Sequence, residues 1–221
     1  MTDAVAPPSR TIATANPAYT MTARTLHWLT AVLILPMIPI GVVIANDQGG
    51  PLQESLYDLH RSVGAVLIPI TVLRLIYRRR NPPLSLPDDI PAIQRLAAKV
   101  THWGLYALLI LQPLVGWIAT SAHGAPIMVF GWFELPPLSA EDHAFSEQLF
   151  WLHRLIGIAT ACLAAAHIGA AVYHHFVRRD RVLMRMITGR RSNPRSGEGT
   201  LAHAKKRAAV TAIQRGIPLA R

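Results

Sequence analysis

Five of the ten histidines in this chain lie inside long apolar stretches of sequence, apart from a pair at the end of the last stretch. Imidazole binds metals and carries protons near neutral pH, and an ionisable side chain inside a membrane is costly, so each marks a candidate functional position. His174 and His175, at the end of the last apolar stretch, are more simply interpreted as interface groups whose polar tips reach water. The candidate positions are His27, His60, His102, His153 and His167.

Four apolar stretches carry these histidines, and each is long enough to cross a hydrocarbon core, which takes about 20 helical residues. Only 15% of the residues are charged, against about 25% in an average soluble domain. The sequence therefore predicts an all-α, integral membrane four-helix bundle and excludes a soluble globular enzyme. The single cysteine, Cys162, excludes an internal disulfide, a cysteine–zinc site and covalent haem attachment. The stretches are Leu26–Ala45, Leu59–Tyr77, His102–Thr120 and Leu149–Val177.

The charges alternate along the chain, although the formal net charge is +10. The connections 46–58 and 121–148 contain acidic residues but no Lys or Arg, whereas the other three polar regions are basic. This is the positive-inside pattern, and it predicts that both termini and the middle connection lie in the cytoplasm, that the two acidic loops lie outside, and that the chain crosses the membrane several times. Arg74 and Arg78–Arg80 are interpreted as determinants of this topology. Nucleic-acid binding is not needed to explain the basic charge.

The topology assigns a depth to each histidine. His27 lies near the inner face, and His60 and His153 lie near the outer face. His167 is about 21 Å deeper than His153, at 1.5 Å per residue, and within roughly 40° of the same helix face. Matching depths predicts two pairs, His60 with His153 outside and His27 with His167 inside.

Facing imidazoles between bundle helices suit the iron of a haem, so the pairs predict two haem b groups. The residue four positions after each proposed ligand is small, which leaves room for a macrocycle; Tyr106, in the same position after His102, is bulky. Leu-His-Arg-x-x-Gly occurs twice, so Arg61 and Arg154 are candidate partners of haem propionates; an interface role for both arginines is the alternative. The four small residues are Ala31, Gly64, Gly157 and Ala171.

Two other interpretations of the histidines stay open at this point. A site for a divalent metal ion is disfavoured because no carboxylate lies beside the histidines in any apolar stretch. A transporter without haem could use the histidines as a proton relay. That alternative predicts a colourless protein with no Soret absorbance band.

Several short motifs resemble the bacterial cytochrome b-561 family of small four-helix, dihaem b-type membrane proteins. The resemblance covers about Met21 to Gly189. It implies that His27, His60, His153 and His167 are the axial ligands. It also implies electron exchange with a quinone; some members pass electrons from superoxide to ubiquinone, and others oxidise quinol or serve partner dehydrogenases. The motifs are Thr25–Trp28, Leu59–Arg61, Trp151–His153, and His167 followed by His174–His175 and Arg178–Arg179.

The expected function is therefore electron transfer between a donor outside the cell membrane, with superoxide as one candidate, and the quinone pool, which would make the chain an oxidoreductase. The alternative is a haem-bearing, quinone-linked subunit for a separate dehydrogenase or hydrogenase. His102, Trp103 and Arg80 are the candidate quinone residues, because a histidine can hydrogen-bond a quinone carbonyl. The expected domains are a polar segment at 1–22, the dihaem domain at 23–189 and a disordered basic tail at 190–221.

Overall fold

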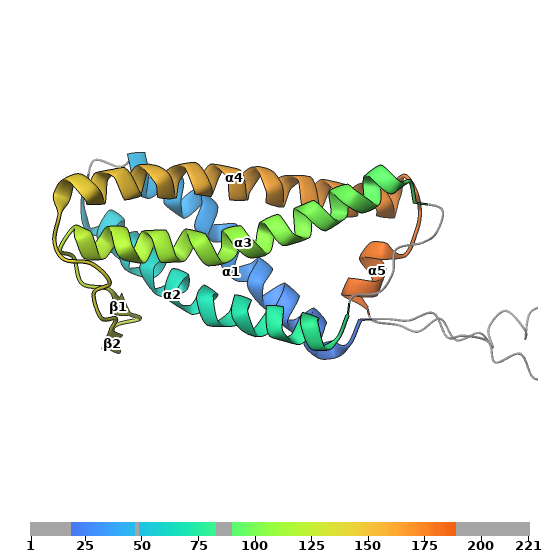
Figure 1. The fold of residues 1–221 in the computed structure, drawn as a ribbon, viewed down its shortest axis with the longest axis horizontal. Helices are drawn as coiled ribbons and strands as arrows, with labels where there is room; N and C mark the ends of the chain where they lie inside the picture. Colours follow the sequence, from blue (N-terminus) through green and yellow to red (C-terminus); the bar gives the residue numbers. More distant parts are fainter. Residues whose placement is uncertain (1–18, 47–48, 83–89, 189–221) are drawn as a thin grey trace, which may run out of the picture. The chain divides into compact units, whose positions relative to one another are not determined.

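The computed structural model describes residues 19–46, 49–82 and 90–188. Four long helices dominate it (Figure 1), and all four are long and apolar enough to cross a membrane. The predicted all-α membrane bundle is confirmed. The predicted tail at 190–221 and most of the segment at 1–22 lie outside the described residues, so those domain limits stay predictions. The helices are α1 (Met21–Asn46), α2 (Pro51–Arg80), α3 (Ala92–Ala122) and α4 (His143–Phe176).

Each helix extends beyond the apolar stretch that predicted it, because polar residues at its ends supply start and stop signals. Pro51 occupies the first turn of α2 after Gly50, which has φ 120°; proline has no N–H to leave unsatisfied there. The basic residues Arg78–Arg80 lie in the last turn of the same helix, where the negative end of the helix dipole stabilises their positive charge. Asp142 caps α4 by accepting a hydrogen bond of 3.0 Å from the Phe145 N–H.

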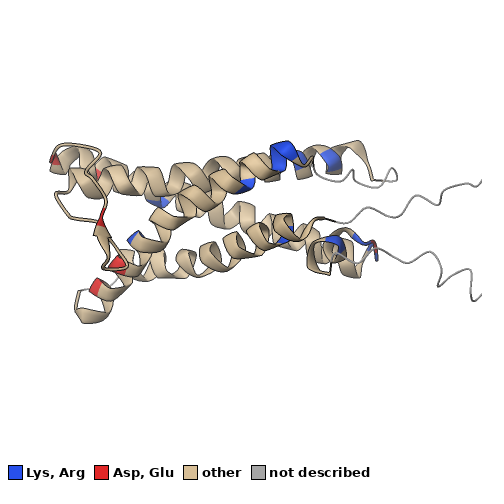
Figure 2. Ribbon diagram, turned by 90° about the horizontal axis from the view of Figure 1, so that it is seen from below, with Lys and Arg blue, Asp and Glu red and all other residues tan. Residues whose placement is uncertain are grey.

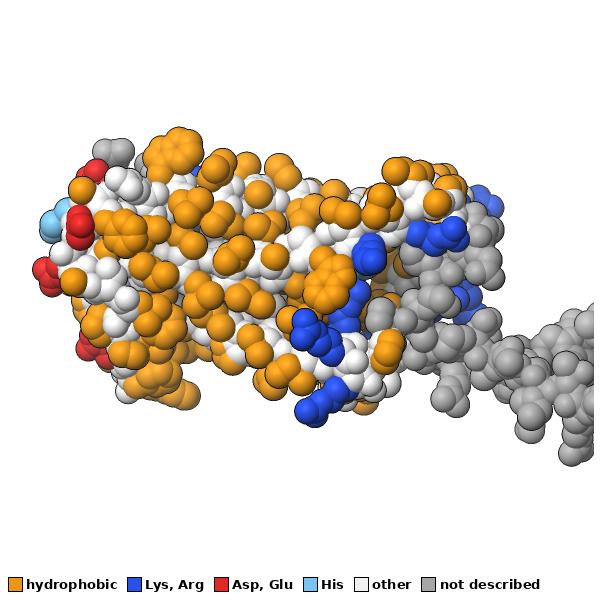
Figure 3. Space-filling view, in the orientation of Figure 1, with side chains coloured by type: hydrophobic (Ala, Val, Ile, Leu, Met, Phe, Trp, Pro, Cys, Tyr) orange, Lys and Arg blue, Asp and Glu red, His pale blue; other side chains and the backbone are white. Residues whose placement is uncertain are grey.

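The helices pack in chain order, α1 on α2, α2 on α3 and α3 on α4. Their buried core is small and includes Met37, Val63 and Leu67. Large apolar side chains remain exposed along all four helices, and they cover much of the face shown in Figure 3. A helix that exposes such side chains over its length is suited to lipid, because hydrocarbon chains solvate them.

The connection between α3 and α4 contains a short hairpin that the sequence analysis did not anticipate. Strands β1 (Met128–Val129) and β2 (Phe133–Glu134) pair antiparallel. Phe130 and Gly131 turn the chain with φ values of 50° and 74°, a conformation that glycine tolerates best. Ser62 of α2 holds the hairpin: its hydroxyl donates to the Met128 carbonyl at 3.1 Å and accepts from the Phe130 N–H at 2.9 Å.

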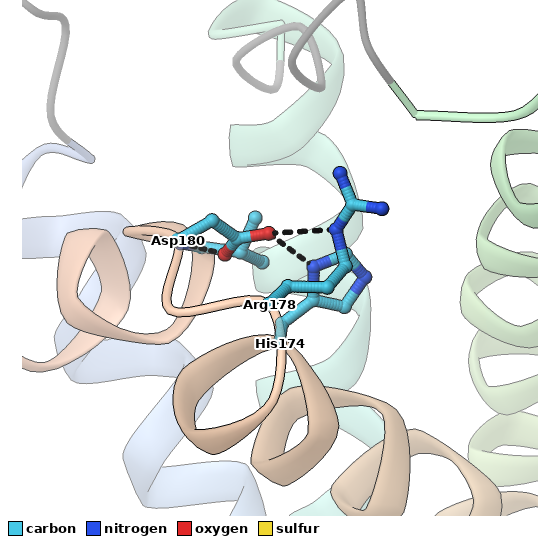
Figure 4. A network of polar contacts seen from close by, with 4 residues as sticks. His174, Arg178 and Asp180 are labelled. Carbon is cyan, nitrogen blue, oxygen red and sulfur yellow. Dashed lines mark hydrogen bonds and ion pairs between the residues drawn. The ribbon is translucent and has the colours of Figure 1, made fainter.

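The opposite end of the bundle carries a short helix, α5 (Val182–Ile187). Arg24 Nε and Trp28 Nε1 both donate to the Met186 carbonyl at 3.2 Å, which satisfies an acceptor left free at the helix end. At the turn from α4, His174 and Arg178 both contact the Asp180 carboxylate (Figure 4).

That carboxylate also starts α5, since it accepts a hydrogen bond of 3.0 Å from the Val182 N–H. Burial of Asp180 would raise its pKa, but the hydrogen bonds from His174 and Val182 outweigh burial and hold the pKa below its usual range. Asp180 is therefore ionised at neutral pH, and it joins the last membrane helix to α5.

Charged residues separate along the helices of the described part of the chain. Figure 2 shows most Asp and Glu at the end that carries the hairpin, and most Lys and Arg at the end that carries α5. Arg61, near the hairpin end, donates to the Pro126 carbonyl at 3.5 Å. The distribution agrees with the predicted topology, in which the basic end faces the cytoplasm. We call the hairpin end outer and the α5 end inner.

Candidate functional site

The outer part of the bundle brings His60 of α2 and His153 of α4 together. Their ring centres are 6.0 Å apart and the ring planes are inclined at 70°. Both side chains are largely enclosed by the helices. These two residues are predicted to pair because they lie at the same depth, and the structure brings them together.

Gln112 of α3 fixes the orientation of the His153 ring. The ring Nδ1 lies 3.0 Å from the Gln112 carbonyl oxygen, and because a carbonyl only accepts, Nδ1 is the donor. The remaining nitrogen, Nε2, then carries the lone pair that a metal requires. The Gln112 side-chain amide also donates to the His153 carbonyl at 3.0 Å and lies 3.2 Å from Nε2.

His60 presents a different feature, a buried ring nitrogen. Its Nδ1 has no hydrogen-bond partner among the described residues. An unsatisfied polar atom in a buried place costs about 1–3 kcal/mol. The outer pair thus combines one imidazole whose Nε2 is left unprotonated with another whose Nδ1 is unsatisfied within the described structure.

Two glycines make room for the outer imidazoles. A Cβ built on Gly116 of α3 would lie 2.9 Å from His153 Cε1, and one on Gly41 of α1 would lie 3.4 Å from His60 Cε1. The glycines that the sequence analysis selected, Gly64 and Gly157, instead face α3: their Cβ positions lie 3.9 Å from Pro113 Cβ and 3.1 Å from Gln112 Nε2. Each of the four helices therefore contributes a glycine at this level.

The inner part of the bundle brings together His27 of α1 and His167 of α4, the second predicted pair. Their ring centres are 6.2 Å apart, with an interplanar angle of 64°. His102 of α3 is a third imidazole here, with its ring centre 5.2 Å from that of His167. The four histidines paired by depth thus form two couples, and α4 contributes one residue to each.

Ring spacing tests whether these couples fit one iron each. A metal–imidazole bond is about 2 Å long, and adding the radius of each ring, about 1.1 Å, separates two rings on opposite sides of one iron by about 6 Å. The His60–His153 and His27–His167 distances agree with this value, whereas the His102–His167 distance is shorter. In the described ranges, no three His, Cys, Asp or Glu side chains converge as a set of ligands for a bare metal ion.

Two arginines of α2, both predicted to be determinants of topology, lie in the inner half of the bundle. Arg74 Nη2 donates to His27 Nδ1 at 2.7 Å, and its guanidinium carbon lies 5.1 Å from the centre of the Tyr106 ring. Arg78, one turn further in, lies over both Tyr106 and Trp103, at 5.4 and 5.8 Å. Because several basic residues follow each other in this region, the sequence does not indicate that Arg74 and Arg78 lie inside the bundle.

The remaining predicted site residues take the following places. His102 lies beside the inner couple and Trp103 lies under Arg78, whereas Arg80 is exposed at the end of α2. At the outer end, Arg61 lies over the Tyr57 ring at 5.2 Å, and Arg154 is exposed.

A membrane bundle with facing imidazoles at two depths defines a class, the membrane haem proteins. The model of prokaryotic cytochrome b561 matches residues 18–189, and the chain belongs to this family. It is a multi-pass protein of the bacterial inner membrane, and the family implies b-type haem.

Three relatives illustrate the similarity. Cytochrome b561 homolog 2 of Escherichia coli (strain K12) is 31% identical over 170 residues, which cover 76% of this chain and 90% of the relative. Cytochrome b561 homolog 1 of the same strain is 29% identical, over 75% of this chain and 94% of the relative. A protein of Yersinia pestis named probable superoxide oxidase CybB is 26% identical, over 75% of this chain and 93% of the relative.

Proposed function

We propose that the chain is a dihaem cytochrome that carries electrons across the membrane, between a donor at the outer face and the quinone pool. The observation that supports this function is the pair of histidine couples, with ring centres 6.0 and 6.2 Å apart, at two depths of one bundle. Two histidines on one iron leave no free position for oxygen, so such a centre transfers electrons rather than activating oxygen.

The side chains have distinct roles in this proposal. Haem b supplies a one-electron iron centre when it is bound. His60 and His153 hold the outer iron, and the Gln112 carbonyl keeps the His153 ring in a ligating orientation. Gly41 and Gly116 leave the space beside the two rings open. His27 and His167 hold the inner iron.

The two ends of the electron path differ in charge and chemistry. At the outer end, Arg61 is a local positive charge that could attract superoxide and pair an outer propionate, as could Arg154. At the inner end, His102 can donate to a quinone carbonyl and exchange its proton, and Trp103 can pack on the quinone ring. Superoxide as the donor is supported by the name of the Yersinia pestis relative.

A second candidate function is supported by the acidic outer surface, which disfavours strong steering of an anion such as superoxide. A basic face of a separate dehydrogenase or hydrogenase would complement it. The chain would then transfer electrons between that partner and the quinone pool. This function predicts a stable complex with the partner on purification from native membranes. The described acidic residues at this end are Glu54, Asp58, Glu134, Glu141, Asp142 and Glu147.

A haem assay on the purified protein tests the proposal. Pyridine haemochrome should give two b haems per chain, His60→Ala should remove one, and His167→Ala should remove the other. His143→Ala is the matched control, because His143 faces His123 in an imidazole contact of 5.4 Å that we assign no iron. A colourless wild-type protein would support the proton relay and overturn the proposal.

Mixing experiments separate the two candidate functions. Reduction of the haems by superoxide, followed by oxidation with a soluble ubiquinone analogue, is expected if the chain acts alone. Slow reduction by superoxide, together with fast reduction by a co-purified dehydrogenase, would replace the first function with the second.

A further inference from the structure

Two guanidinium groups lie one turn apart inside the inner half of the bundle. Arg74 and Arg78 are both partly buried, and both lie against the Tyr106 ring of α3 at 5.1 and 5.4 Å. An aromatic ring attracts a cation through its negative face and so fixes the direction of the guanidinium. The ring does not neutralise the charge, however, and charge inside a membrane is costly.

Neither Arg74 nor Arg78 forms an ion pair with a carboxylate in the described part of the chain. Asp180 is the described acid at the inner end, and it pairs with His174 and Arg178. The phenol of Tyr19, close to Arg78, does not compensate: burial raises its pKa, so it is neutral at pH 7. Two partly buried cations that no described carboxylate neutralises favour an anionic ligand.

The contact that Arg74 makes with His27 connects this charge to the iron site. Arginine only donates, so His27 Nδ1 accepts at 2.7 Å and its proton is on Nε2. An imidazole that binds iron through Nε2 instead carries its proton on Nδ1, where it can no longer accept from arginine. Ligation by His27 therefore requires a new acceptor for Arg74.

We propose that Arg74 and Arg78 form the carboxylate-binding site of the inner haem and hold its propionates. The inference rests on the proposed function, in which His27 and His167 bind that haem. Arg74 contacts His27 directly, and Arg78 lies one turn, about 6 Å, nearer the inner face. The guanidinium fork matches a carboxylate and binds it through two parallel hydrogen bonds. Tyr106 holds both forks from one side.

Charge at this place has a measurable effect on the iron. Reduction adds an electron to the haem, so a nearby cation favours the reduced state. Arg74→Gln and Arg78→Gln should each lower the reduced-to-oxidised ratio of the inner haem about tenfold at a fixed potential, which corresponds to about 59 mV for one electron. Arg79→Gln is the matched control, because it removes a charge from an exposed position on the same helix, and it should change the ratio less than about twofold.

Haem analogues test for the carboxylate itself. Wild-type apoprotein in nanodiscs should take up inner haem b in preference to haem dimethyl ester, whose propionates are neutral. Arg74→Gln and Arg78→Gln should lose this preference, and Arg74→Lys and Arg78→Lys should keep part of it, because lysine retains the charge without the fork. The lysine variants keep the test valid if a glutamine variant fails to fold.

The outcomes separate this inference from the proposed function. A wild-type protein with two haems that takes up the ester and the acid equally well would overturn the propionate site while leaving electron transfer intact. The site would then belong to another anion, such as a lipid phosphate, and the potential shift in Arg74→Gln would depend on anionic lipid in the nanodisc. A protein in which His167→Ala removes no haem would overturn both.

Discussion

Gly116 is the position where a single methyl group tests the geometry of the outer histidine couple. A Cβ at this residue would lie 2.9 Å from Cε1 and 3.1 Å from Nδ1 of His153. Ordinary contacts between carbon atoms are about 3.5–4.0 Å, so Gly116→Ala displaces the ring by roughly 0.6 Å or more. The ring cannot yield freely, because Nδ1 is tied to the Gln112 carbonyl at 3.0 Å.

The expected cost follows from this overlap. Adding a methyl group to a well-packed interior costs about 1–3 kcal/mol. If the ring moves to relieve the strain, its Nε2 moves away from the proposed iron position. The free energy is then lost from haem binding. Since about 1.4 kcal/mol is a factor of ten, the outer haem should bind about fivefold to about 140-fold more weakly. The inner haem should be unaffected.

The assay is transfer of haem from the purified variant to excess apomyoglobin, followed by absorbance at the Soret band. Gly104→Ala is a packing control, because its Cβ would lie 2.8 Å from Leu163 Cδ2 and touches no imidazole. Gly169→Ala is a second control, because nothing lies within 4 Å of its Cβ position. Loss of the outer haem in Gly104→Ala to the same extent, or wild-type transfer in Gly116→Ala, would refute the reasoning.

Three further predictions concern other parts of the chain. His102→Ala should leave both haems bound but slow the reduction of a ubiquinone analogue in stopped flow; unchanged turnover would remove His102 from the quinone site. Ser62→Ala breaks two hydrogen bonds to the outer hairpin, worth about 1 kcal/mol each, and hydrogen exchange at Phe130 should accelerate, whereas Ser55→Ala, at an exposed site, should leave it unchanged. The lowered pKa of Asp180 means that its ionised form stabilises the turn into α5 above the unfolded pKa, and that this stability is lost as the pH falls through the folded pKa. Exchange in α5 should therefore be faster in Asp180→Asn than in wild type at pH 7, and the difference should disappear as the pH falls through the folded pKa; a difference that stays constant across an acid titration would count against the ion pair.

Much of the architecture is predictable from the sequence because membranes constrain it strongly. Apolar length predicts the helices, and alternation of charge predicts their direction. These two signals also give each histidine a depth, and residues at the same depth of a small bundle have few alternative partners. The couples His60–His153 and His27–His167 follow from depth alone, and the structure brings both together.

The supporting side chains were not predictable in the same way. Gly116 and Gln112 contact His153 from another helix. The sequence around His153 does not indicate which face of α3 is turned toward it. Gly41 is one glycine among many in apolar segments, where small residues are common. Arg74 resembled a topology signal because it stands close to Arg78–Arg80. Strands of two residues, such as β1, are too short for an alternating pattern.

The last helix of the bundle contributes one histidine to each couple, and this has a consequence for biogenesis. A nascent chain that has inserted only its first three helices presents one of the two proposed ligands of each iron, so neither proposed iron site can close before translation reaches α4. Binding of the prosthetic groups is then the last step of assembly, after α4 has inserted. A chain truncated before His153 would emerge from the translocon without pigment, and a chain truncated between His153 and His167 could load a single centre.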